Sequence, residues 1–322
     1  MSSLAIGQVS DYARAARKRI GELVRKTPLH YSPRFSDETG AEVYFKLENL
    51  QHTGSFKLRG AANRLLTLSD KQRQAGCVTA SSGNHGAAVA YAMQQLGVEG
   101  VIFVPEQTSP AKLEAIRSYG GRAEHFGTDG LDTEMHARAY AREHGMFYIS
   151  PYNDPEVIAG QGSCGVEISE QLADLDVLYI AVGGGGLVAG VGSVLKTANP
   201  DLRIVGCQPA ASAVMAHSVE AGRILDEPSQ PTLSDGTAGG VEKGSITFDL
   251  CRDLVDEFVL VDEAAIGAAM CQFFDLEHQL IEGAAGVAVA AMLAQGKTIA
   301  GRKVAVLICG GNVSRDTFKR IL

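Results

Sequence analysis

The chain has few of the features that mark a nucleic-acid-binding, secreted or membrane protein. It lacks a run of basic residues, and its 37 Asp and Glu outnumber its 29 Lys and Arg, which gives a formal net charge of −8 at pH 7. This balance argues against a nucleic-acid partner. The N-terminus has no basic head followed by an apolar run, so no signal peptide is indicated. The apolar runs are also too short for a membrane span.

The sequence is equally poor in metal and disulfide motifs. Its six cysteines are scattered and include no CxxC pair. This spacing indicates reduced thiols and a cytoplasmic location rather than a disulfide framework or a zinc site. No His/carboxylate spacing and no Ser–His–Asp arrangement stands out, so we expect no metal site. With 322 residues and 45% hydrophobic content, one or two domains are expected.

From Gly76 onward the chain alternates short strands with helices. The strands are expected at 77–80, 101–104, 123–126 and 146–150, which predicts a compact α/β unit. The rest of the chain keeps this alternation, and 177–182 and 304–308 read as fully apolar, buried strands. Helices are expected at 8–25 and 59–68, the second directly after a strand at 43–48.

A lysine occupies the joint between that strand and that helix. Lys57 follows Gly54, a residue without a side chain that lets the backbone approach a ligand closely. Considered alone, Lys57 would be an ordinary surface lysine at the start of a helix. Two other unusual stretches favour a chemical role for it.

The first is a run of four glycines, 183–186, between an apolar strand and a helix that begins at Leu187. Successive backbone N–H groups can converge here on an anion, and the helix dipole adds to the attraction. The run is neither a Walker loop nor a GxGxxG motif. A flexible linker is the alternative, but linkers rarely separate an apolar strand from an apolar helix, so a phosphate cradle is favoured.

The second stretch, 81–86, is Ser-Ser-Gly-Asn-His-Gly at another strand-to-helix turn. Its side chains and free N–H groups could bind a carboxylate. The alternative is an ordinary helix N-cap, but a cap needs only one of these polar residues.

Cys309 ends the last apolar strand and precedes two glycines. On its own it would be a small buried hydrophobe.

Together these stretches resemble the fold-type-II pyridoxal-phosphate enzymes, in the serine/threonine dehydratase and serine racemase family. The resemblance covers nearly the whole chain, and its carriers follow in one order: 53–60, 81–86, 157–162, 183–186, 235–236 and 310–312. It implies an α/β fold of the tryptophan synthase β type, with two domains built on twisted, mostly parallel sheets. The large cofactor domain would comprise 1–75 and 151–322, and the small mobile domain 76–150. A homodimer is implied as well.

The resemblance also implies roles for individual residues. Lys57 would bond to the aldehyde of pyridoxal 5'-phosphate, Asn84 would bind the ring hydroxyl and Cys309 would face the pyridine nitrogen. The implied cofactor-binding set is Phe56, Lys57, Asn84, Gly183, Gly184, Gly185, Gly186, Leu187, Gly236 and Cys309. The implied catalytic residues are Lys57 and Ser82, and the implied substrate-binding residues are Ser81, Ser82, Asn84 and His85.

A thiol opposite the pyridine nitrogen is a weak partner, which favours prompt loss of a β-hydroxyl over a long-lived carbanion. We therefore expect a dehydratase, or ammonia-lyase, acting on a small amino acid, with L-threonine or L-serine as the default substrate. A hydroxyectoine-derived diamino acid is an alternative if Asp132 faces the site. A 3-hydroxyaspartate substrate would require an arginine to bind its second carboxylate, and no such arginine is found in the sequence.

Serine racemase is the main alternative, because Ser82 occupies the place of the racemase serine. Against it, Gln208 and Val214 replace the acidic ligands of the racemase metal site, and Tyr152 stands where racemases carry asparagine. A β-replacement synthase shares the fold but usually has threonine where this chain has His85. A non-catalytic, cofactor-binding protein is disfavoured by the intact Lys57 and Asn84.

Overall fold

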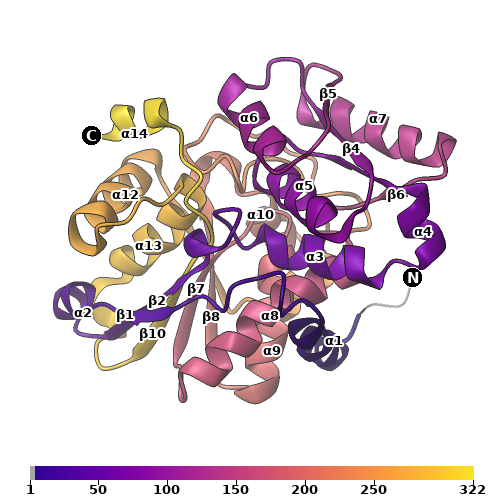
Figure 1. The fold of residues 1–322 in the computed structure, drawn as a ribbon. Coiled ribbons are helices and arrows are strands. Elements are labelled where there is room, and N and C mark those ends of the chain that lie inside the picture. Colours follow the sequence, from indigo (N-terminus) through magenta and orange to yellow (C-terminus); the bar gives the residue numbers. More distant parts are fainter. Residues whose placement is uncertain (1–3) are drawn as a thin grey trace.

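The computed structural model describes residues 4–322, which form two sheets surrounded by helices (Figure 1). The strands of the larger sheet are β1 (Leu29–Tyr31), β2 (Glu42–Leu47), β7 (Val177–Ala181), β8 (Arg203–Pro209), β9 (Glu257–Val261) and β10 (Lys303–Ile308). Those of the smaller sheet are β3 (Cys77–Ala80), β4 (Gly100–Val104), β5 (Ala123–His125) and β6 (Phe147–Tyr148). Each sheet with its helices is called here the six-stranded unit or the four-stranded unit.

The helices divide between the two units. Those of the six-stranded unit are α1 (Ile6–Arg19), α2 (Pro33–Thr39), α3 (Lys57–Thr67), α8 (Pro155–Gln171), α9 (Gly186–Ala198), α10 (Val214–Glu220), α11 (Ile246–Leu254), α12 (Glu263–Glu277), α13 (Gly283–Gln295) and α14 (Arg315–Ile321). Those of the four-stranded unit are α5 (Asn84–Leu96), α6 (Pro110–Ser118) and α7 (Gly130–Glu143), and α4 (Asp70–Ala75) connects α3 to the first strand of that unit. Short 3₁₀ turns occupy Glu48–Leu50, Ala210–Ser212 and Gly296–Ile299.

Both sheets are mostly parallel. The six-stranded sheet has the order β1-β2-β10-β7-β8-β9 and the four-stranded sheet the order β5-β4-β3-β6. Within residues 4–322, β1 is the one strand that pairs antiparallel, with β2. The last strand of the chain, β10, lies between β2 and β7 because its run Val304–Ile308 is apolar enough to be buried on both faces. The predicted α/β class with parallel sheets is therefore confirmed.

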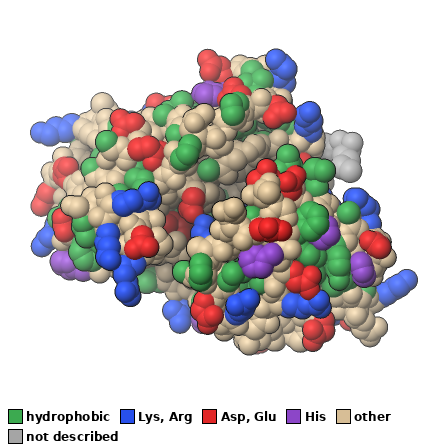
Figure 2. All heavy atoms as spheres, turned by 90° about the horizontal axis from the view of Figure 1, so that it is seen from above, with side chains coloured by type: hydrophobic (Ala, Val, Ile, Leu, Met, Phe, Trp, Pro, Cys, Tyr) green, Lys and Arg blue, Asp and Glu red, His purple; other side chains and the backbone are tan. Residues whose placement is uncertain are grey.

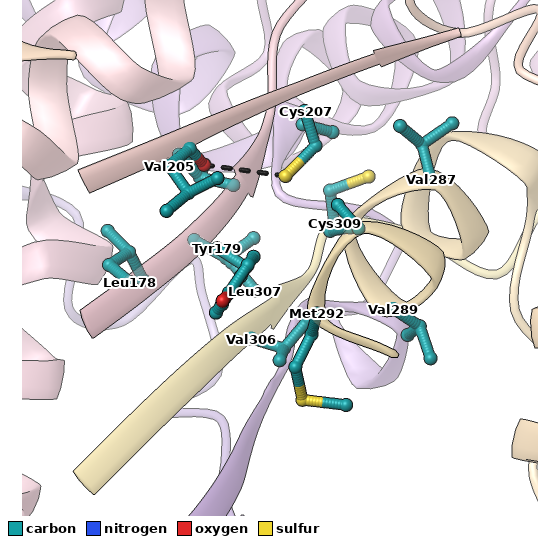
Figure 3. Packing of buried hydrophobic residues seen from close by; sticks show 14 of the residues in the cluster. Leu178, Tyr179, Val205, Cys207, Val287, Val289, Met292, Val306, Leu307 and Cys309 are labelled. Atoms are coloured by element: carbon teal, nitrogen blue, oxygen red, sulfur yellow. Dashed lines mark hydrogen bonds between the residues drawn. The ribbon is translucent and has the colours of Figure 1, made fainter. Parts of the chain in front are cut away.

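The core of the six-stranded unit lies between its sheet and α13. Tyr179 of β7, Val205 of β8 and Leu307 of β10 belong to one buried cluster with Val287 and Met292 of α13, and Figure 3 shows Met292 beside β10. Helix α13 is apolar all round, and its residues 283–292 are buried. A helix of this kind has no solvent face, because it is buried against the central strands.

Some elements differ from the prediction. The first helix is Ile6–Arg19, shorter than the expected 8–25, and Gly21 follows its end. Strands β1 and β9 and helix α2 were not predicted. Helix α2 has a clear signal, because Ser32 accepts a hydrogen bond from the Phe35 N–H at 3.3 Å and Pro33 is the first helical residue.

Four charged side chains are fully buried where β2, α3 and α8 meet. Arg59 Nε donates to Glu48 Oε2 at 2.7 Å, and Arg59 Nη2 donates to Glu167 Oε2 at 2.8 Å. Lys46 Nζ donates to the same Glu167 oxygen at 2.7 Å. Two cations and two anions thus pair with no exposure to solvent. Each charge depends on the others, because an unpaired buried charge is costly.

Charged side chains of both signs are mixed over the face seen in Figure 2. Across residues 4–322, no helix combines the length and the apolar character needed to cross a membrane.

Replacing Arg59 with Ala should strongly destabilise the fold, because Glu48 and Glu167 would remain buried without their partner. We expect the free energy of unfolding, measured by urea denaturation, to fall by about 3–5 kcal/mol. The control is Lys26→Ala, which removes a solvent-exposed pair with Glu170 and should cost less than about 1 kcal/mol. Equal losses in the two variants would contradict this account of the network.

Candidate active site

A cleft of about 620 Å³ lies between the two units. It is lined by all the residues that the sequence nominated, which come from several distant parts of the chain. They are Phe56, Lys57, Ser81, Ser82, Asn84, His85, Gly183–Gly186, Leu187, Gly236 and Cys309. The structure therefore brings the whole predicted set together at one place.

Lys57 is the first residue of α3, and this helix is held from two sides. Leu58 and Leu65 pack into the core of the four-stranded unit. On the other side, a Cβ on Gly60 would lie 2.3 Å from Gln161 Nε2 of α8, so only glycine permits this approach. The helix start is thereby fixed at the cleft wall.

The amino group of Lys57 lies in a poorly hydrated part of the cleft. Its Nζ donates to the Pro151 carbonyl at 2.9 Å. Burial lowers the pKa of Lys57 to about 8, although Cys309 and Glu282 act in the opposite direction. About a tenth of this amine is therefore neutral at pH 7, far more than for an ordinary lysine, and the neutral form is the one that a nucleophile or base requires.

The four glycines lead from β7 into α9 with no side chain capping the helix. Gly185 has φ +83°, in the region that glycine favours. A Cβ on Gly184 would lie 2.5 Å from the ring of Tyr152, and one on Gly183 would lie 3.0 Å from Thr237 Cα. The N–H groups at the start of α9 have no partner within the helix. Side chains are excluded here, and the exposed donors suit a phosphate.

The loop 81–86 leads from β3 into α5. Ser81 Oγ accepts a hydrogen bond from the Gly83 N–H at 3.2 Å. His85 Nε2 lies 3.2 Å from the Ile149 carbonyl oxygen, and since a carbonyl can only accept, Nε2 carries the proton. Burial lowers the pKa of His85 to about 3, so its ring is neutral. A carboxylate at this loop would be held by N–H and hydroxyl groups rather than by an imidazolium charge.

A carboxylate that sequence reasoning missed lies beside this loop. Glu282 precedes α13, is 4% exposed and lines the cleft. Asn84 Nδ2 donates to both of its oxygens, at 2.8 and 3.0 Å. Its one signal in the sequence is its place at a helix N-cap, a position that glutamate seldom takes.

Cys309 closes the floor of the cleft at the end of β10. Its carbonyl accepts a hydrogen bond from the Phe56 N–H at 3.0 Å, which ties the lysine segment to the central strand. Burial raises the pKa of the Cys309 thiol well above its ordinary value, so the side chain is neutral.

Comparison with known proteins identifies the chemistry of this cleft. A family model described as pyridoxal-phosphate-dependent enzyme matches residues 20–310. The chain belongs to this family. An L-threonine ammonia-lyase of Thermotoga maritima is 39% identical over 308 residues, which is 95% of this chain and 76% of that one.

Solved structures of the same fold extend the comparison. The maize serine racemase superimposes with a TM-score of 0.91 at 32% identity, over 97% of this chain and 95% of that one. The processed form of threonine deaminase isoform 2 from Solanum lycopersicum superimposes with a TM-score of 0.93 at 33% identity, over 98% of this chain and 87% of that one. The predictions of fold type II, of pyridoxal 5'-phosphate as cofactor and of a pyridoxal-phosphate-dependent ammonia-lyase are confirmed.

The described residues fit this cofactor. The glycine run offers uncapped N–H groups where any Cβ would collide, and Lys57 offers a neutral amine in the same cleft. The roles assigned to Phe56, Gly236 and the other residues toward the cofactor stay predictions, as does the expected absence of a metal site.

The positions that bear on racemase and diamino-acid chemistry can be placed. Gln208 is buried and its Oε1 accepts from the Ala216 N–H at 2.7 Å, while Val214 is part of the core. Asp132 does not line the cleft, and its Oδ2 accepts from the Thr128 hydroxyl at 3.3 Å. Tyr152 lies at the glycine run, where burial raises its pKa to about 12.

Two ion pairs connect the units, one solvent-exposed at the cleft and one partly buried. Lys112 of α6 pairs with Asp235 at 3.1 Å, and Arg138 of α7 pairs with Glu242 at 3.0 Å. Each pair joins a helix of the four-stranded unit to the loop that precedes α11.

Replacing Gly184 with Ala should weaken cofactor binding, because the new methyl group would collide with the Tyr152 ring. Overpacking of this kind costs about 1–3 kcal/mol, so we expect the dissociation constant of pyridoxal phosphate to rise about tenfold or more. Absorbance titration of the apoprotein would measure it. Gly7→Ala is the matched control, because a Cβ there meets nothing within 4 Å. Unchanged affinity in Gly184→Ala would contradict the cradle.

Proposed function

We propose that this enzyme converts L-threonine or L-serine to the corresponding 2-oxo acid and ammonia by α,β-elimination. The observation that carries the proposal is the convergence of a lysine of lowered pKa, an uncapped glycine cradle and a serine-rich helix start in one cleft. The similarity to the Thermotoga L-threonine ammonia-lyase supports the choice of substrate.

Each part of the cleft has a task in this reaction. Bound pyridoxal phosphate supplies the electron sink that makes the substrate α-proton acidic. The N–H groups of Gly183–Leu187 hold its phosphate, and the loop 81–86 orients the substrate carboxylate. Lys57 Nζ accepts the α-proton, a step that requires its neutral form. The β-hydroxyl then leaves with a proton as water, and water added at the α-carbon releases ammonia.

Cys309 favours elimination over slower alternatives. In its proposed place toward the pyridine nitrogen, the neutral thiol would be a poor proton donor, because its pKa is raised by burial. The negative charge that develops at the α-carbon is then less stabilised than it would be opposite a carboxylate. Prompt departure of the β-hydroxyl is the consequence.

We propose residues 76–150 as a small domain that closes on the substrate against a large domain of 1–75 and 151–322. The exposed ion pair Lys112–Asp235 beside the cleft suits a boundary that opens and closes. We also propose a homodimer in the cytoplasm. The six cysteines are all free, which suits a reducing compartment.

Serine racemisation is the second candidate. Ser82 lines the cleft, and a serine on the face opposite the lysine could return a proton to the α-carbon. The similarity to maize serine racemase supports this candidate. The positions of Gln208 and Val214 support elimination as the main reaction, since neither supplies a carboxylate.

The function is tested by 2-oxo acid release from purified protein with cofactor, across L-threonine, L- and D-serine, both 3-hydroxyaspartates and hydroxylated diaminobutyrates. We expect release from L-threonine or L-serine, and none in a Lys57→Ala variant, which should also lose the cofactor absorbance band. Conversion of L- to D-serine without 2-oxo acid would favour the racemase. An intact band without any turnover would overturn both.

The lowered pKa of Lys57 predicts how cofactor capture depends on pH. Only the neutral amine attacks the aldehyde, so the capture rate should rise with pH and level off just above pH 8. Stopped-flow absorbance of the apoprotein with pyridoxal phosphate would measure it. A rate that still climbs toward about pH 10, as for an ordinary lysine, would contradict the desolvated site.

A further inference from the structure

Glu282 has no task in the reaction as described so far, although it is the most connected carboxylate in the cleft. Its oxygens accept from Asn84 Nδ2 at 2.8 and 3.0 Å and from the Asn312 N–H at 3.1 Å. Asn84 Oδ1 in turn accepts from Asn312 Nδ2 at 2.7 Å. The orientation of the Asn84 amide is thus determined, with its nitrogen toward Glu282.

The surroundings are shaped for this carboxylate. A Cβ on Gly310 would lie 2.6 Å from Glu282 Oε1, and one on Gly236 would lie 3.5 Å from the same atom. Cys309 Sγ lies 4.0 Å from it. Three residues assigned to the cofactor, Asn84, Gly236 and Cys309, therefore surround one acidic side chain.

We propose that Glu282 is a positioning residue whose ionised carboxylate holds Asn84 and the turn 309–312 in the arrangement that receives the cofactor ring. The inference rests on the proposed role of Asn84 and Cys309 toward that ring. An amide has two N–H groups, so Asn84 can give one to Glu282 and the other to the ring hydroxyl. Without Glu282 the amide loses the acceptor that holds its nitrogen, and Asn312 alone remains to orient it.

The charge state of Glu282 follows from the groups that face it. Burial and the charge of Asp235 raise the pKa of Glu282, while the hydrogen bonds from Asn84 and Asn312 and the Lys57 amine of α3 lower it. The net result is a pKa raised to about 7. The Cys309 thiol at the end of β10 is neutral, and Asp235 is paired with Lys112 of α6. A raised carboxyl pKa means that the ionised form predominates only above about pH 7. Cofactor positioning should therefore weaken as the pH falls through 7.

The test compares Glu282→Gln with a buried carboxylate elsewhere in the same unit. Glu277 is the control, because it pairs with Ser32 and His30, and Glu277→Gln should leave cofactor binding unchanged. For Glu282→Gln at pH 8 we expect the dissociation constant of pyridoxal phosphate to rise about tenfold, since hydrogen bonds to a charged group are lost. The loss of cofactor affinity between pH 8 and pH 6 should also become smaller than in the wild type, because only the part due to Lys57 remains.

Thermal unfolding and a conservative variant separate positioning from simple loss of structure. The melting temperatures of apo Glu282→Gln and apo Glu277→Gln should be similar, and Glu282→Asp should recover part of the affinity and its pH dependence. Wild-type affinity with a wild-type pH dependence in Glu282→Gln would overturn the proposal. The dehydratase assignment has its own test, because it would be contradicted by absence of 2-oxo acid release from the wild-type enzyme. That result would leave the comparison of cofactor affinities valid.

Discussion

The position of the reactive lysine depends on the buried charges beneath α3. Arg59 lies two residues after Lys57 and pairs with Glu48 beside β2 and with Glu167 on α8. Burying four charges is expensive, and the expense is offset only when each is paired in good geometry. The network therefore tolerates one arrangement of α3 relative to the central sheet. Because Lys57 begins that helix, the same constraint sets where its amine enters the cleft.

At the glycine run and at Glu282, close contacts leave no room for a side chain at the glycine positions, and polar groups that can bind the cofactor or its ligands face the cleft. At the run, Tyr152 occupies the space that side chains would need, so only backbone donors face the cleft. At Glu282, the missing side chain of Gly310 makes room for a carboxylate. In both places glycine is required by a neighbour from a distant part of the chain rather than by the local turn alone.

Much of the site could be predicted because its signals are local. A glycine run between an apolar strand and a helix, or four polar residues at a helix start, is visible in a few adjacent positions. Glu282 could not be found in this way, since its partner Asn84 lies 198 residues earlier. The edge strand β1 was missed because it has three residues and is mostly exposed, so it lacks the apolar run that revealed β7 and β10. Strand β9 was missed although its residues 258–261 are apolar. The role of Tyr152 likewise depends on a contact that only the folded chain creates.

The ion pairs between the two units differ in kind from those under α3. Lys112–Asp235 faces solvent and Arg138–Glu242 is partly buried, so dissolved ions, which screen charges over about 8–10 Å, act on the first pair most. The Arg59 network is shielded from such screening. Ionic strength should therefore weaken the polar contact between the two units while the network that positions Lys57 keeps its strength.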